Sequence, residues 1–173
     1  MEASEVDGRP ERPLIERAIV GESIRGLGLP APITVPQDAT LLAVVETMRA
    51  QHIGCVLVTG PQGKLAGIFT ERDLMTRVAL GSPKWEAERV ADYMTPDPET
   101  LRPDDRIAWA LKLMHIGGYR HVPLTDEEGR PVGVVSIKDI VDFIVDLFPA
   151  PVLNLPPDPR RKPDCEFMGG GED

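Results

Sequence analysis

The feature that most constrains the fold is an internal repeat with a constant separation of 66 residues. Residues 67–73 read GIFTERD and residues 133–139 read GVVSIKD. The same separation, without a gap, relates further pairs along the chain: Pro30 and Pro96, Pro32 and Pro98, Thr34 and Thr100, Asp38 and Asp104, Met48 and Met114, Val56 and Val122. A constant register over so many positions indicates a duplicated unit, and the two copies should adopt the same fold.

Each copy predicts the same order of elements. Prolines favour an extended segment at 30–35 and again at 96–100. Asp38 and Asp104 are the expected N-caps of helices over 39–51 and 106–116. β-Branched runs separated by Gly-containing turns predict hairpins over 53–70 and 119–136, each leading directly into a helix. The pattern predicts an α+β fold of two βαββα-like repeats.

The boundaries follow from Pro, Gly and charge content. We expect a disordered tail at 1–13, repeat 1 at 14–81, repeat 2 at 82–149 and a Pro/Gly-rich tail at 150–173. A short helix is expected over 14–26, and Ser82 with Pro83 should start a helix that carries Trp85, Val90 and Met94 as core or subunit contacts.

Composition limits the partners. A net charge of −9 and a pI near 4.9 argue against nucleic acid or an anionic membrane as the main partner. Two cysteines, Cys55 and Cys165, imply no disulfide framework, and the first residues lack a signal-peptide pattern. Charged residues also interrupt the most apolar segment, 132–148. The sequence therefore predicts a cytoplasmic protein that does not enter the membrane.

The chemistry concentrates where each hairpin runs into its helix. A helix start suits a phosphate, and a carboxylate one turn in can accept hydrogen bonds from a sugar diol. Ser136 with Asp139, and Thr70 with Asp73, have this spacing. The same spacing also forms a capping box, in which the acidic residue only satisfies backbone N–H groups. Both interpretations stay open at the level of sequence.

The duplicated unit resembles the cystathionine β-synthase (CBS) domain, and the tandem pair resembles the regulatory Bateman module. The resemblance rests on the Gly-apolar-x-Ser/Thr-x-x-Asp ends of both repeats, on Thr34 and Thr100, and on the strand that begins at Tyr119. It implies two repeats packed about a pseudo-twofold axis, and binding of AMP, ADP, ATP or S-adenosylmethionine in clefts between them. It also implies regulation of an unidentified partner protein and a disc-like homodimer, which would cover the apolar helix positions 140, 141, 144 and 147.

The resemblance assigns ligand-binding roles residue by residue. Asp73 and Asp139 would hold ribose hydroxyls, and Thr70 and Ser136 would contact ribose or phosphate. The remaining expected site residues are Thr34, Cys55, Val56 and Arg72 in the first cleft, and Thr100, Arg120, His121, Val122, Pro123 and Lys138 in the second. Because Arg120 and His121 replace Gly54 and Cys55, we expect the second cleft to favour a phosphorylated ligand.

No pattern predicts an enzyme, a required cofactor or a metal site. The chain lacks a Gly-x-Ser-x-Gly elbow, a phosphate loop and a His-Glu-x-x-His motif. Cys55 lies in an apolar strand, which should raise its thiol pKa and make it a poor nucleophile. The alternatives to a nucleotide sensor are a structural dimerisation or scaffold module whose clefts bind nothing and, with less support, an enzyme on an unrecognised fold.

Overall fold

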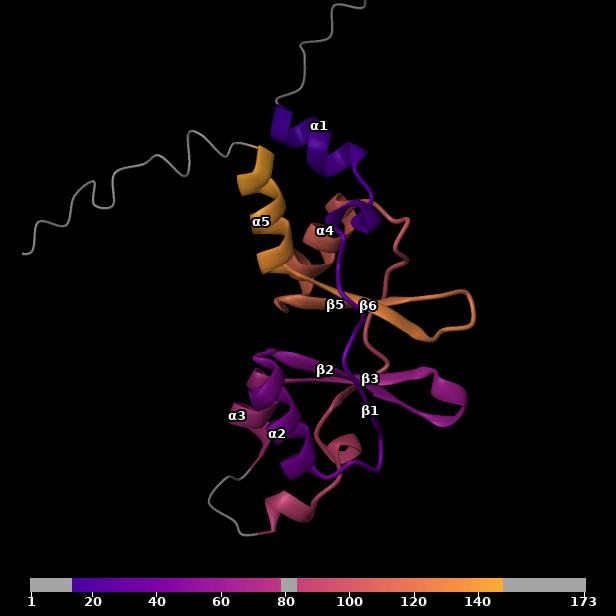
Figure 1. The fold of residues 1–173 in the computed structure, drawn as a ribbon, viewed down its shortest axis with the longest axis vertical. Helices are drawn as coiled ribbons and strands as arrows, with labels where there is room; N and C mark the ends of the chain where they lie inside the picture. Colours follow the sequence, from indigo (N-terminus) through magenta and orange to yellow (C-terminus); the bar gives the residue numbers. More distant parts are fainter. Residues whose placement is uncertain (1–13, 79–83, 148–173) are drawn as a thin grey trace, which may run out of the picture.

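The computed structural model describes residues 14–78 and 84–147, which form two stacked units (Figure 1). The first unit contains β1 (Thr34–Pro36), α2 (Leu41–Gln51), β2 (Cys55–Thr59), β3 (Leu65–Thr70) and α3 (Glu71–Arg77). The second contains β4 (Thr95–Pro96), α4 (Ile107–Gly117), β5 (His121–Thr125), β6 (Pro131–Ser136) and α5 (Ile137–Leu147). The helix α1 (Leu14–Gly21) and a 3-10 turn at Ile24–Leu27 precede them. The predicted pair of repeats is confirmed.

Each unit is built around an antiparallel hairpin. β2 pairs with β3 and β5 pairs with β6, so that Cys55 lies opposite Thr70 and His121 opposite Ser136. The two pairings are equivalent under the repeat, and they bring the start of each hairpin beside the residue that begins the following helix. β1 adds to β2 in parallel.

One strand crosses between the units. β4 precedes α4 in the second unit but pairs with β3 of the first sheet, opposite Gly67. A Cβ at Gly67 would lie 2.8 Å from the backbone oxygen of Thr95. Glycine is therefore needed here because the two backbones approach too closely for a side chain.

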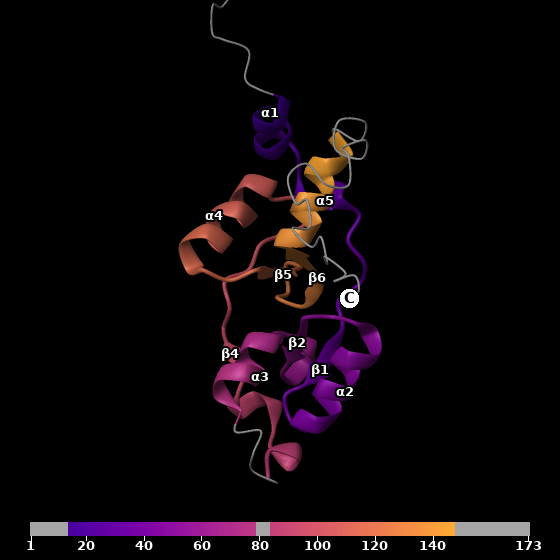
Figure 2. The same ribbon diagram turned by 90° about the vertical axis from the view of Figure 1, so that its left-hand side faces the viewer.

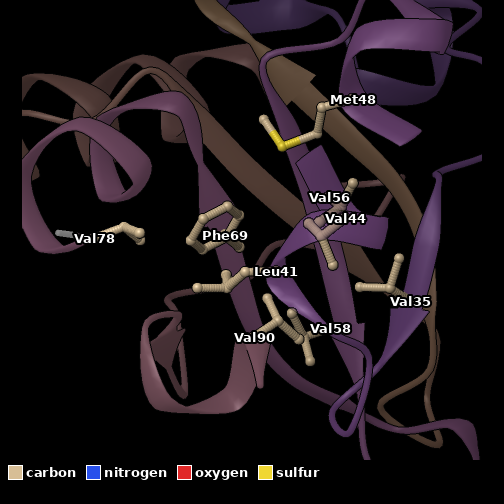
Figure 3. Close-up of a cluster of buried hydrophobic side chains, with 9 residues drawn as sticks. All are labelled: Val35, Leu41, Val44, Met48, Val56, Val58, Phe69, Val78 and Val90. Atoms are coloured by element: carbon tan, nitrogen blue, oxygen red, sulfur yellow. The ribbon is translucent and has the colours of Figure 1, made fainter. Parts of the chain in front are cut away.

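The two sheets lie in the middle of the molecule with the helices outside (Figures 1 and 2). Each unit has its own hydrophobic core, and Figure 3 shows the first, which is centred on Phe69 and Leu41. Val90 from the second repeat is fully buried in the first core, and Ile24 from the first repeat is fully buried in the second. Since each core needs a residue from the other repeat, the two units stabilise one another.

Four local predictions were wrong, and two of them concern helix caps. The helix over 41–51 is capped by Thr40, whose side chain accepts a hydrogen bond from the N–H of Ala43, because the helix begins too late for Asp38 to reach it. Asp104 likewise does not cap α4. Its carboxylate instead forms an ion pair with Arg25 at 2.7 Å.

The other two concern helix length. The segment expected to be helical over 14–26 is α1 up to Gly21 followed by the separate 3-10 turn. The described part of the helix expected after Pro83 consists of two 3-10 turns, Trp85–Ala87 and Val90–Asp92. Trp85 and Met94 do pack on the first core, as expected. The two tails and the expected helix start at Ser82 lie outside the described residues.

Candidate functional site

Two cavities lie between the repeats and are equivalent under the 66-residue register. The Asp73 cleft, about 460 Å³, combines residues 70–73 of repeat 1 with residues 97–99, 117–121 and Pro123 of repeat 2. The Asp139 cleft, about 640 Å³, combines residues 136–139 of repeat 2 with residues 30–33 and 51–55 of repeat 1. Both volumes suit a small organic ligand. Any occupant of either cleft would contact both repeats.

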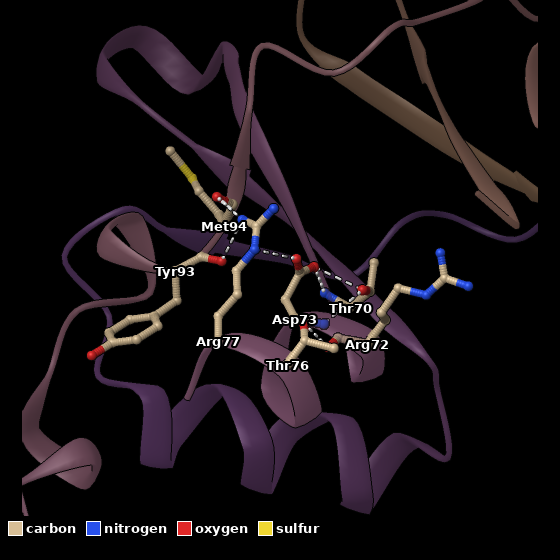
Figure 4. Close-up of polar contacts among 7 residues, drawn as sticks. All are labelled: Thr70, Arg72, Asp73, Thr76, Arg77, Tyr93 and Met94. Atoms are coloured by element: carbon tan, nitrogen blue, oxygen red, sulfur yellow. Dashed lines mark hydrogen bonds and ion pairs between the residues drawn. The ribbon is translucent and has the colours of Figure 1, made fainter. Parts of the chain in front are cut away.

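The carboxylate of the Asp73 cleft is fully engaged by the protein (Figure 4). Its Oδ2 accepts hydrogen bonds from the N–H of Thr70 at 2.9 Å and from the Thr70 hydroxyl at 2.7 Å. Its Oδ1 forms an ion pair with Nε of Arg77 at 3.3 Å. The Arg77 guanidinium also donates to the backbone oxygens of Tyr93 and Met94. Asp73 is 6% exposed, so these contacts offset the cost of burying its charge.

The carboxylate of the Asp139 cleft keeps one oxygen available. Oδ2 of Asp139 accepts from the N–H of Ser136 at 2.7 Å and from the Ser136 hydroxyl at 2.6 Å. The position equivalent to Arg77 is Phe143. Among the described residues, none donates to Oδ1 of Asp139. Both capping boxes are therefore present, but only Asp139 retains an oxygen for an added hydrogen bond.

The two clefts share a wall. Gly54, Glu71, Arg120 and His121 line both of them. Matching backbone hydrogen bonds hold this wall together, from the N–H of Glu71 to the oxygen of Gly54 at 3.1 Å and from the N–H of Ile137 to the oxygen of Arg120 at 3.0 Å. The predicted assignment of Arg120 and His121 to the second cleft alone does not match this arrangement, because β5 starts between the clefts. Two further assignments are reversed, since Pro123 lines the first (Asp73) cleft and Cys55 lines the second (Asp139) cleft.

The shared wall sets the protonation of two groups. Burial, and then the charge of Arg120, lower the pKa of His121, whereas the carboxylates of Glu71 and Asp139 act in the opposite direction. His121 is therefore neutral at pH 7. Burial raises the pKa of the Cys55 thiol to about 12, helped by Asp139 and Glu71. The expectation of an unreactive thiol agrees with this environment.

Ten of the fourteen expected site residues line a cleft. The Asp73 cleft contains Thr70, Arg72, Asp73, Arg120, His121 and Pro123. The Asp139 cleft contains Cys55, Arg120, His121, Ser136, Lys138 and Asp139. Thr34, Thr100, Val56 and Val122 line neither cleft. Val56 and Val122 point into the two cores, because they follow the cleft-lining position on their strands and face the other side.

Several lining residues were missed from the sequence, namely Pro30, Ile33, Glu71, Arg77, Asp97, Glu99 and Tyr119. Most belong to the extended segments or the hairpin starts. The repeat register carried a usable signal, since it relates lining residues of the two clefts, such as Ile33 to Glu99. What it could not show is that the extended segment of one repeat meets the helix start of the other.

This fold and these clefts define a class of protein, a tandem pair of βαββα repeats with two equivalent inter-repeat cavities. The chain belongs to the CBS-domain family, since the family model for the CBS domain matches residues 24–80 and 90–146. The mitochondrial CBS domain-containing protein CBSX3 of Arabidopsis thaliana is 32% identical over 112 residues, which cover 62% of this chain and 54% of that protein. The chain thus matches about half the length of that relative.

Solved structures show the same architecture. A CBS-domain containing protein from Agrobacterium tumefaciens has a TM-score of 0.64 at 31% identity, covering 71% of this chain and 99% of that one. The CBS pair of protein MJ0100, solved with 5′-methylthioadenosine and S-adenosyl-L-methionine, has a TM-score of 0.64 at 22% identity, with coverage of 71% and 99%. At that identity the likeness shows the fold alone. No helix in the described part of the chain is long and apolar enough to cross a membrane.

Proposed function

We propose that this chain is a regulatory module that binds an adenosine-containing ligand in the clefts between its CBS repeats and signals to a partner protein. The observation that carries the proposal is the open oxygen of Asp139 at the edge of a ligand-sized cavity. A carboxylate fixed by its own helix cap is a preorganised acceptor for a ribose hydroxyl. The proposal includes no catalytic role, no bound cofactor and no nucleic-acid or membrane partner. We further propose that the module acts in the cytoplasm.

Cationic side chains near Asp139 would bind the phosphate groups of AMP, ADP or ATP. Lys138 and Arg120 both line the Asp139 cleft. Lys138 pairs with Asp142 on the exposed side of α5, so its amine would exchange that carboxylate for a phosphate. Arg120 has no ion-pair partner among the described residues. A guanidinium without a fixed partner is well suited to bind phosphate.

Two structural neighbours support the class of ligand. MJ0100 was solved with 5′-methylthioadenosine and S-adenosyl-L-methionine, and CBSX2 was solved with AMP. These compounds share the adenosine moiety and differ in the group at the 5′ position. We therefore expect the adenosine moiety to be recognised in the Asp139 cleft by the open oxygen of Asp139, and the 5′ group to decide between ligands.

Thermal unfolding against AMP, ADP, ATP, GTP, S-adenosylmethionine and NADH tests the proposal. A ligand at about 100 times its dissociation constant should stabilise the fold by about 2.7 kcal/mol. Asp139→Asn is the matched variant, since the amide still caps the helix but no longer accepts a charge-assisted bond. No stabilisation by any adenosine compound would contradict the proposal.

The alternative is a scaffold module whose clefts bind nothing. The arrangement at Asp73 favours it locally, because both carboxylate oxygens are already satisfied by Thr70 and Arg77. A scaffold would show no ligand-dependent stabilisation, while its oligomeric state would be unchanged by nucleotides.

We also propose a homodimer with twofold symmetry. The uncovered face of α5 is smaller than predicted, because of the four expected positions Ile140 is fully buried, Ile144 and Leu147 are half-buried, and Val141 is exposed at 50%. Large exposed apolar side chains do occur on α3 and α4, with Met75 at 80%, Ile116 at 71% and Trp109 at 51% exposure. Such positions are typical of an interface. A monomer mass by light scattering at micromolar concentration would contradict a dimer.

A further inference from the structure

The two clefts differ in charge at three positions that the repeat makes equivalent. The Asp139 cleft has Ala31, Ile33 and Ile137 at these positions. The Asp73 cleft has Asp97, Glu99 and Glu71. Glu71 lies on the shared wall, but Asp97 and Glu99 line the Asp73 cleft alone. The duplication therefore places carboxylates in one cleft where the other has apolar side chains.

The described arginines of the Asp73 cleft form no ion pair with these carboxylates. Arg77 is held by Asp73 and by two backbone oxygens. Arg72 donates to the backbone oxygen of Gly118 at 3.1 Å. Among the described residues, none forms an ion pair with Glu71, Asp97 or Glu99. Arg72 and Arg120 are the cations of this cleft without an ion-pair partner among the described residues, and Arg120 is shared with the Asp139 cleft.

Tyr119, which contacts Glu99, adds no positive charge to the Asp73 cleft. The Tyr119 hydroxyl donates a hydrogen bond to the Glu99 carboxylate. Burial, together with that carboxylate, raises the pKa of Tyr119 to about 12, so the phenol stays neutral. The contact holds the Glu99 carboxylate at the cavity. A negatively charged wall in a partly enclosed cavity repels phosphate and attracts neutral or cationic groups.

We propose that the Asp73 cleft selects adenosyl ligands whose 5′ group carries no net negative charge, as in S-adenosylmethionine, whose sulfonium and ammonium groups outweigh its carboxylate, while the Asp139 cleft takes phosphorylated adenosine. The proposal rests on the proposed function, because it assigns a different ligand class to each of the two clefts. Selectivity here arises from repulsion of the wrong ligand. One module would then respond to two classes of adenosyl compound at the same time.

Isothermal titration calorimetry of the full chain tests the assignment. AMP should bind with one site per chain, S-adenosylmethionine with one site per chain, and saturation with one should leave the affinity for the other nearly unchanged. In Asp97→Asn combined with Glu99→Gln, a second AMP site should appear, with affinity at least about tenfold higher than at the wild-type Asp73 cleft. S-adenosylmethionine should bind more weakly by a similar factor.

The substitutions are chosen to preserve structure. Asp97 has φ +43°, a left-handed conformation that Asn also tolerates, and Gln can still accept from the Tyr119 hydroxyl. Asp38→Asn combined with Glu127→Gln removes the same charge from exposed positions that line neither cleft. The uncharged ligand 5′-methylthioadenosine should bind the wild type and both double variants alike.

The outcomes separate the two claims. Two equal AMP sites in the wild type, or displacement of AMP by S-adenosylmethionine one for one, would overturn the selectivity and leave the proposed function intact. A single AMP site in Asp97→Asn with Glu99→Gln would also overturn it. Absence of binding by every adenosyl compound would overturn the proposed function itself.

Discussion

Replacing Asp139 by alanine should harm ligand binding more than replacing Asp73, while Asp73→Ala should harm stability more. In Asp139→Ala the helix loses a cap, which costs about 1 kcal/mol. The ligand loses one or two charge-assisted hydrogen bonds at Oδ1, each worth about 1.5–3 kcal/mol. At about 1.4 kcal/mol for each factor of ten, affinity for AMP or ATP should therefore fall at least about tenfold, and by about ten-thousandfold if two strong bonds are lost.

Asp73→Ala removes a cap and also an ion pair. The side chain of its partner Arg77 is 46% exposed and keeps its two backbone acceptors. Loss of the ion pair should therefore lower the free energy of unfolding by about 1–2 kcal/mol beyond the loss of the cap. At about 3 °C for each kcal/mol, the melting temperature should drop by roughly twice as much as in Asp139→Ala. Because Oδ1 of Asp73 is already occupied, the effect on nucleotide affinity should be small.

Calorimetry with AMP and thermal unfolding on the same preparations measure both quantities. Asp139→Asn serves as the control, since it should keep most of the stability and lose most of the affinity. Equal AMP affinity in Asp139→Ala and wild type would refute the role given to this carboxylate. A larger loss of affinity in Asp73→Ala would reverse the ranking of the two clefts.

Three further predictions concern the fold. Gly67→Ala should destabilise by about 1–3 kcal/mol in chemical denaturation, because the added methyl group meets the backbone of β4, whereas Gly21→Ala has open space and should cost little. The pKa of His121 is lower in the folded state, so its contribution to stability is complete above the unfolded pKa near 6.5 and is lost as pH falls through that value towards the folded pKa. His121→Asn should show a smaller drop in melting temperature between pH 7.5 and 5.5, and an unchanged drop would exclude this histidine as the cause. Deletion of residues 1–13 and 155–173 should leave the melting temperature nearly unchanged, and a loss of several degrees would show that these segments pack.

The sequence by itself determined the repeat and the hairpins. The constant register, the β-branched runs and the Gly-containing turns are local signals, so the bounds of β2, β3, β5 and β6 lie close to those expected. The cap pairs at Thr70 and Ser136 are also local, because their partners stand three residues away. The predicted N-caps at Asp38 and Asp104 were wrong, because each N-cap position lies two residues further along the chain, at Thr40 and Arg106.

Only the tertiary structure decided what faces each carboxylate. Ile24 of the first repeat packs in the second core, and Val90 of the second repeat packs in the first core. With the chain crossing between the repeats at these residues, residues 97–99 lie next to Asp73. Nothing local in the sequence encodes this contact, since it depends on how two sheets pack. The state of Oδ1 is different, because it depends on a local residue: Arg77 lies one turn after Asp73 in α3, whereas the equivalent residue after Asp139 is Phe143. Two nearly identical motifs thus differ first through this residue, and then through the carboxylates at 97 and 99 that only the packing of the other repeat brings to Asp73.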